Sequence, residues 1–150
     1  MYALWPEKET KEKKINTNID KKIKEKTNEI NNNSLVLKFN IYNTNILFTG
    51  DIEKEAEGSL VKKYKNELES DIIMVPHHGS KTSSTYSFLK EVKPKISVIS
   101  CGKDNLFKHP NDEVLKRYEK VNSKIYRTDK NGLISFKIFK NKKVKIETFK

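Results

Sequence analysis

The sequence has 150 residues, enough for one domain with a hydrophobic core, but only 35% of them are hydrophobic. This share is low, so the core is modest or part of the chain lies outside it. Basic residues outnumber acidic ones by 31 to 20, and the net charge of +11 favours nucleic acid or an anionic membrane as a partner, with a lysine-rich solvated surface as the alternative. Neither a bilayer-spanning run nor a signal peptide is evident, so the chain is predicted to be soluble as written. The single cysteine, Cys101, excludes an internal disulfide and is interpreted as a small buried residue.

The first 33 residues have an unusual composition. Residues 1–6 are apolar and resemble the end of a strand. Residues 7–33 are almost entirely Lys, Glu, Asn, Thr and Asp, with isolated isoleucines that are too few to pack firmly. We therefore predict a short apolar start followed by a mobile, charged linker or insertion over 1–33, and a folded domain over 34–150.

Strand and helix patterns alternate in the rest of the chain. Short β-branched or aromatic runs predict strands at residues 35–39, 45–49, 71–75, 95–100, 124–128, 133–139 and 144–149. Apolar residues at helical spacing predict helices at 53–69, 84–92 and 111–121, the last capped by Asn111. This order predicts an α/β fold built mostly from β-α-β units, with a largely parallel sheet, and a C-terminal hairpin that adds antiparallel strands at its edge.

The stretch from Val75 to Ser84 is the most informative part of the sequence. It places His77 and His78, two of only three histidines, directly after a short apolar strand. Asp51 follows an earlier predicted strand, and His109 lies in the loop after a later one. Because the carboxyl ends of parallel strands meet at one edge of a sheet, we expect these side chains to converge there.

Carboxylate and imidazole groups on separate rigid elements suit a divalent metal ion, and Asp51, His77 or His78, and His109 provide them. Adjacent residues in extended backbone point to opposite faces, so we expect one histidine of the pair to be a ligand and the other to bind a phosphate or donate a proton. The alternatives are that Asp51 caps the following helix, that the pair are exposed loop histidines, and that His109 is structural. The Ser80 hydroxyl is a nucleophile only beside a base, and otherwise forms hydrogen bonds or caps a helix.

Six stretches of the chain form a recognisable set: residues 31–37, 47–53, 75–84, 94–102, 108–110 and 126–129. Together they resemble the C-terminal metallo-β-lactamase-like domain of ComEC-type DNA-uptake (competence) proteins, over about residues 35–139. The most specific part is His77-His78-Gly79-Ser80 with the upstream Gly50-Asp51 pair. The resemblance implies an αββα sandwich, of which this chain looks like the second half, and a nuclease that degrades the DNA strand not taken up.

The resemblance also implies a binuclear site for zinc or manganese. Asp51 matches the aspartate that bridges the metal ions, while His77, His78 and His109 match later site histidines, with His78 and His109 as catalytic groups. In the implied phosphodiester hydrolysis, substrate phosphates would bind to Ser80, Lys81 and Lys103.

One part of the family pattern is missing from the sequence. The family takes most ligands of its first metal from a His-x-His-x-Asp-His motif, and this chain has no histidine before His77. We therefore expect a fragment, a truncated product or half of a split protein that is inactive alone, with an uncovered face or unpaired edge in the strands near Leu35 or Lys95. Its implied partners are DNA and the missing half or the membrane channel, on the extracytoplasmic side, although localisation stays open. The alternatives are a non-catalytic basic DNA-binding module and an inactive remnant.

Overall fold

The structure is a computed structural model that describes residues 2–5 and 29–150. The linker expected over 7–33 lies largely outside these described residues. Its last part, residues 29–33, forms a short helical turn, and the apolar start contributes a strand at Tyr2–Trp5, in agreement with its resemblance to a strand. None of the helices in the described part is both long and apolar enough to cross a bilayer.

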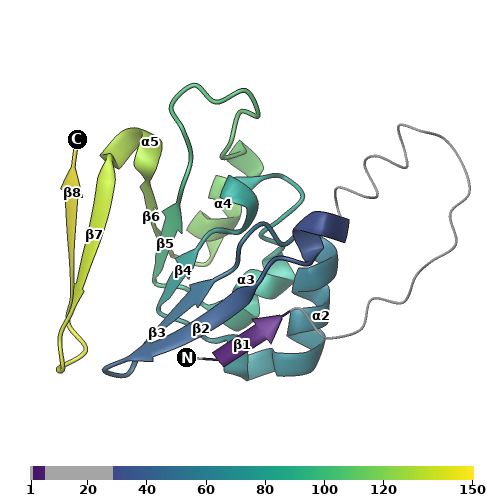
Figure 1. The fold of residues 1–150 in the computed structure, drawn as a ribbon, viewed down its shortest axis with the longest axis horizontal. Coiled ribbons are helices and arrows are strands. Elements are labelled where there is room, and N and C mark those ends of the chain that lie inside the picture. Colours follow the sequence, from purple (N-terminus) through teal and green to yellow (C-terminus); the bar gives the residue numbers. More distant parts are fainter. Residues whose placement is uncertain (1, 6–28) are drawn as a thin grey trace, which may run out of the picture.

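A six-stranded sheet forms the centre of the fold (Figure 1). Its spatial order follows the sequence: β1 (Tyr2–Trp5), β2 (Val36–Ile41), β3 (Thr44–Phe48), β4 (Ile72–Met74), β5 (Ile96–Ile99) and β6 (Lys124–Arg127). The first three strands are antiparallel, and β3 to β6 run parallel. Tyr42 and Asn43 join β2 to β3 with φ values of 49° and 61°, the left-handed geometry of a two-residue hairpin turn. The mixed α/β fold predicted from the sequence is therefore confirmed.

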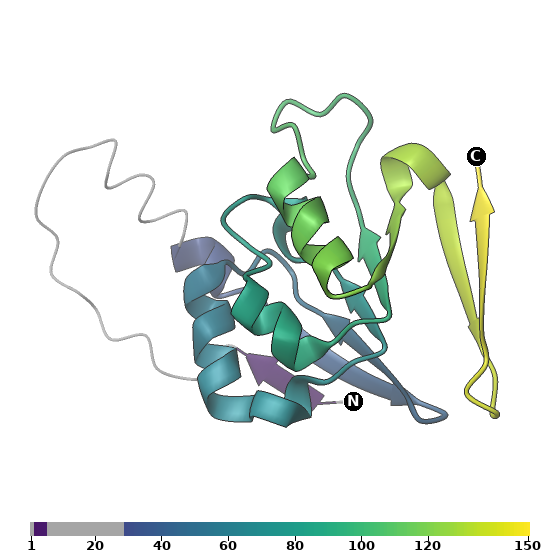
Figure 2. The ribbon, with the colours of Figure 1, turned by 180° about the vertical axis from the view of Figure 1, so that it is seen from behind.

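The connecting helices cover one face of this sheet (Figure 2). They are α2 (Lys54–Tyr64), continued by the short 3-10 helix η1 (Lys65–Leu68), then α3 (Tyr86–Val92) and α4 (Asp112–Lys120). The predicted cap of α4 is confirmed, because the Asn111 side chain accepts a hydrogen bond from Glu113 N. Fully buried side chains fill the layer between helices and sheet, among them Leu47, Ile73, Ile99, Leu60, Phe88 and Tyr118.

The C-terminal hairpin differs from its prediction. Strands β7 (Leu133–Ile138) and β8 (Val144–Phe149) form a separate two-stranded sheet, so the prediction that they extend the edge of the central sheet is wrong. The short helix α5 (Thr128–Asn131) follows β6 and ends at Gly132, which has a φ of 70°. A Cβ at Gly132 would lie 2.0 Å from the carbonyl oxygen of Phe149, so only glycine allows this close approach.

An apolar groove of about 450 Å³ separates this hairpin from the helix-free face of the sheet. Its walls are formed by Ile41, Ile46, Phe48, Ile72, Met74, Leu133, Ile134, Ser135, Phe136 and Ile138. The strand that follows Leu35 is β2, which is paired with β1 on one side and β3 on the other. The strand that follows Lys95 is β5, which is paired with β4 and β6. The expectation of an unpaired edge there is wrong, and the expectation of an uncovered face near these two residues stays a prediction.

Candidate functional site

The loops that follow β3, β4 and β5 meet at one rim of the central sheet. Asp51 follows β3, His77 and His78 lie in the 3-10 segment η2 (Pro76–Gly79) after β4, and His109 lies in the loop after β5. Backbone hydrogen bonds tie the loops together, from His77 N to the oxygen of Gly50 at 3.1 Å and from Asn111 N to the oxygen of Gly79 at 2.9 Å. The structure thus brings together the residues that their positions after parallel strands predict to be neighbours.

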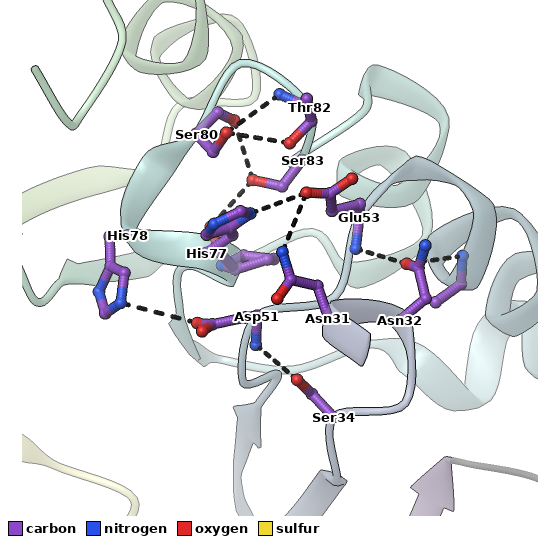
Figure 3. A network of polar contacts seen from close by, with 12 residues as sticks. Asn31, Asn32, Ser34, Asp51, Glu53, His77, His78, Ser80, Thr82 and Ser83 are labelled. Carbon is purple, nitrogen blue, oxygen red and sulfur yellow. Dashed lines mark hydrogen bonds and ion pairs between the residues drawn. The ribbon is translucent and has the colours of Figure 1, made fainter. Parts of the chain in front are cut away.

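His78 faces Asp51 at the exposed side of this rim (Figure 3). Its Nε2 lies 3.7 Å from Asp51 Oδ1, and the two side chains are 51% and 45% exposed. The other ring nitrogen, Nδ1, lies 2.7 Å from the backbone oxygen of Ser100. Because a carbonyl oxygen only accepts, Nδ1 carries the proton, and Nε2 of the neutral ring is left to accept a proton or bind a metal ion.

His77 lies deeper and faces a different carboxylate (Figure 3). Its Nδ1 is 3.1 Å from Glu53 Oε1, where the side chains are 22% and 4% exposed. The angle is not that of a hydrogen bond, so this buried nitrogen has no aligned partner among the described residues. Both histidines have left-handed backbone, with φ values of 47° and 54°, and this turn directs neighbouring side chains to separate carboxylates.

Glu53 is a site residue that the sequence analysis did not identify, although it falls at the start of the helix expected over 53–69. Its own position is fixed by two asparagines: Asn31 Nδ2 donates to its Oε1 at 3.3 Å, and Glu53 N donates to Asn32 Oδ1 at 2.8 Å. Its spacing of two residues from Asp51 is the only sequence signal that it could share the rim.

His109 completes the cluster of imidazoles. Its ring centroid lies 5.8 Å from that of His77. Partial burial lowers the pKa of His109, and the charges of His77 and His78 lower it further. The close approach of its loop depends on Gly79, which has a φ of +81° and where a Cβ would lie 2.6 Å from Pro110 Cβ.

The three predicted substrate-binding residues lie in different environments. Ser80 is buried, and its Oγ lies 2.9 Å from Thr82 Oγ1. Lys81 Nζ is 2.7 Å from Glu113 Oε1, so its charge is directed to α4. Lys103 is exposed in the loop after β5. Of the three, only Lys103 presents its charge in the loop that carries His109.

A buried polar network supports the segment that follows the histidine pair. Glu57 in α2 accepts hydrogen bonds from Ser84 N and from Thr85 N, the latter at 2.8 Å. Arg117 Nη1 in α4 donates to the backbone oxygen of Ser83 at 2.8 Å and to that of Ser84 at 3.3 Å. Burial raises the pKa of the Glu57 carboxyl. Sequence reasoning missed this support, although Glu57 lies one helical turn after Glu53.

The rim has the donor types of a metal site but not the arrangement. Imidazole and carboxylate suit zinc or manganese. The donors, however, form separate pairs, Asp51 with His78 and Glu53 with His77. Within residues 2–5 and 29–150, no three His, Cys, Asp or Glu side chains are placed to hold one ion. The described residues alone do not fit a metal ion, so the binuclear centre stays a prediction that requires further ligands.

Comparison with known proteins gives three informative relatives. The chain is 38% identical to ComE operon protein 3 of Bacillus subtilis over 112 residues, which is 75% of this chain and 14% of that protein. It is 40% identical to competence protein ComA of Neisseria gonorrhoeae over 106 residues, 71% of this chain and 15% of that protein. Recombination protein 2 of Haemophilus influenzae is 30% identical over 112 residues, again 75% and 14%.

No protein-family model matches the chain. The similarity covers most of this chain but only about one seventh of the length of each relative. Two of the three relatives have names that refer to competence or to a Com operon. These similarities support a competence-related family for the chain.

Proposed function

We propose that this chain acts in DNA uptake, and that its rim of histidines and carboxylates is one wall of a metal-dependent phosphodiester hydrolase. The observation that carries the proposal is the convergence of Asp51, His77, His78 and His109 from the ends of three successive parallel strands. The competence-related relatives support the choice of DNA as the substrate. Their greater length provides sequence from which the remaining ligands can come.

The geometry gives the residues of this wall distinct roles in the proposal. Asp51 and His78 are the accessible donors, and the contact of His78 with Ser100 fixes the ring so that Nε2 is presented towards Asp51. His77 and His109 lie together behind them. A metal ion in a completed site would supply a bound water of low pKa and stabilise charge on the phosphate. Lys103 is the predicted substrate-binding residue that is most open to a phosphate, whereas Lys81 would have to leave Glu113.

A chimera tests this proposal directly. In ComE operon protein 3, the segment that aligns with this chain is replaced by the matching residues of this chain. The rest of the relative then supplies any ligands that this chain lacks. We expect DNA hydrolysis that requires a divalent metal, and a loss of at least about 100-fold in rate for Asp51→Ala or His78→Ala. The control is the same protein with its own segment reinserted through the same cloning sites.

Two results would contradict the proposal. One is a folded chimera that hydrolyses no DNA while the reinsertion control does. The other is an Asp51→Ala chimera with an unchanged rate, which would remove Asp51 from the site. For the chain alone we expect no metal-stimulated hydrolysis, and a robust signal would show that no further ligands are needed.

A second candidate is a non-catalytic DNA-binding module, which is favoured by the net charge of +11. This alternative predicts DNA affinity that falls steeply with salt and survives replacement of His77, His78 and His109 by alanine. It also predicts that the chimera above restores no hydrolysis. Hydrolysis by the chimera separates the two functions, and filter binding at two salt concentrations with the triple variant shows whether DNA binding requires the histidines.

A further inference from the structure

An exposed apolar pair lies at the tip of the loop between β5 and α4. Leu106 is 95% exposed and Phe107 is 79% exposed, more than any other large hydrophobic side chain that the structure describes. This loop projects beyond the helices and the sheet (Figures 1 and 2). Single exposed apolar residues are ordinary, but two adjacent ones on a projecting loop next to a candidate site indicate a contact with a partner.

The base of the loop is held by one side chain. Asn105 Nδ2 donates to the backbone oxygens of Gly102 at 3.0 Å and His109 at 2.7 Å, and Asn105 Oδ1 accepts from His109 N at 2.9 Å. Lys108 N also donates to the oxygen of Asn105 at 3.0 Å. These bonds close the loop on itself, so the tip is presented to solvent in a defined geometry.

The Phe107 ring is oriented by the site itself. It stacks on His109 with a centroid distance of 5.8 Å and an interplanar angle of 21°. His109 in turn lies 5.8 Å from His77. A flat group stacked on the open part of Phe107 would therefore lie three ring-to-ring steps from His77, through Phe107 and His109. The aromatic tip thus leads directly into the candidate site.

The charges around the tip favour an anionic partner. Residues 102–109 contain Lys103 and Lys108 with Asp104 as the one acid, and all three are exposed. An aromatic ring between two lysines matches the recognition of single-stranded nucleic acid, in which bases stack on the ring and cations contact the backbone. Duplex DNA does not offer this contact, since its bases are already stacked on each other and paired.

We propose that the loop of residues 102–108 binds single-stranded DNA, with a base stacked on Phe107 and the adjacent phosphates bound by Lys103 and Lys108. This inference rests on the proposed function, which takes DNA as the substrate, and adds that the strand is unpaired where it reaches the site. Two apolar side chains are far too small a patch for a stable protein–protein interface, which buries roughly 800 Å² on each partner. A membrane surface is the remaining candidate, and the experiment includes it.

The test is fluorescence anisotropy with the full chain, in EDTA so that binding is measured apart from hydrolysis. The probes are a labelled thymidine oligonucleotide of about 15 nucleotides, an abasic strand of equal length and a hairpin duplex. We expect Phe107→Ala to weaken binding of the thymidine strand about tenfold or more, and Phe107→Trp to preserve it. The wild-type chain should bind the abasic strand as weakly as Phe107→Ala binds the thymidine strand. Phe107→Ala should lose little affinity for the hairpin duplex. The matched control is Phe139→Ala, because Phe139 is also exposed and lies next to Lys140 but in the distant hairpin.

The outcomes separate this inference from the proposed function. If the chain binds the oligonucleotides but Phe107→Ala and the abasic strand behave like wild type, the stacking inference is overturned and the proposed function stands. Absence of binding to every DNA would also overturn the stacking inference, whereas the proposed function is decided by the chimera. Cosedimentation with phosphatidylglycerol vesicles is the third measurement. If Phe107→Ala loses binding to the vesicles but binds the thymidine strand like wild type, the partner of the loop is a membrane surface and the stacking inference is overturned.

Discussion

Replacing Glu57 by alanine should destabilise the segment that carries the histidine pair into α3. The Glu57 side chain is fully buried and accepts the backbone N–H groups of Ser84 and Thr85. Without the carboxylate these donors have no acceptor in the position they now use, and each buried donor left without a partner costs about 1–3 kcal/mol. Removal of a desolvated carboxyl offsets part of this cost, so we expect a loss of about 3 kcal/mol in the free energy of unfolding.

Urea unfolding followed by circular dichroism measures this loss. The matched control is Glu55→Ala, an exposed glutamate in the same helix, for which the change should stay within about 0.5 kcal/mol. A loss below about 1 kcal/mol for Glu57→Ala would show that the carboxylate does not hold the segment.

The same residue predicts a dependence of stability on pH. Burial raises the pKa of Glu57 above its usual 4.5, so the folded protein binds more protons than the unfolded chain between 4.5 and the raised value. Its contribution to stability therefore falls as the pH rises through that window. Glu57→Gln has no group that titrates there, so the stability of wild type relative to this variant should decrease as the pH rises above 4.5. A relative stability that is constant or increases would contradict the assigned direction.

Three further predictions concern other parts of the fold. Gly79→Ala should lower stability by about 2 kcal/mol, measured by urea unfolding, because of the positive φ and the 2.6 Å approach of a Cβ to Pro110; a neutral effect would mean that the loop adjusts freely. Asp129→Asn should lower the free energy of unfolding by about 1–3 kcal/mol, because the carboxylate accepts hydrogen bonds from Arg127 Nε at 3.0 Å and Nη2 at 2.6 Å. An unchanged free energy of unfolding in the same assay would refute this prediction. Phe48→Ser should reduce the binding of an apolar fluorescent dye to the groove beside the hairpin, with a stability change of at most about 1 kcal/mol; unchanged dye fluorescence would place the dye elsewhere.

Local patterns in the sequence were sufficient for most of the fold. The strands and helices between β2 and β6 follow hydrophobic periodicity, and the alternation of the two fixes the parallel part of the sheet. The C-terminal hairpin was assigned correctly as a hairpin but placed wrongly. Its alternating residues are equally compatible with an edge strand and with a separate sheet, so the local pattern does not decide between them.

The candidate site was predictable to a similar depth. Asp51, His77, His78 and His109 could be found because each follows a strand, and topology alone brings strand ends together. Glu53 and Glu57 were not found, because their partners lie more than 20 residues away in the sequence. The burial of the Ser80 side chain was equally hidden, since a small hydroxyl residue in a loop is usually exposed.

The pairing at the rim also determines from which side the site can be completed. Glu53 is almost fully buried against His77, and Gly79 packs tightly on Pro110, so the inner side of the rim is closed. Asp51 and His78 are half exposed and present their free donor atoms outwards, so any further ligand must reach these two first. The proposed hydrolysis would therefore depend on groups that approach this outer side, whereas the proposed contacts of the lysines and Phe107 with DNA would need none of them. It follows that the two activities should separate, with DNA binding already present in the chain alone and hydrolysis only in the completed site.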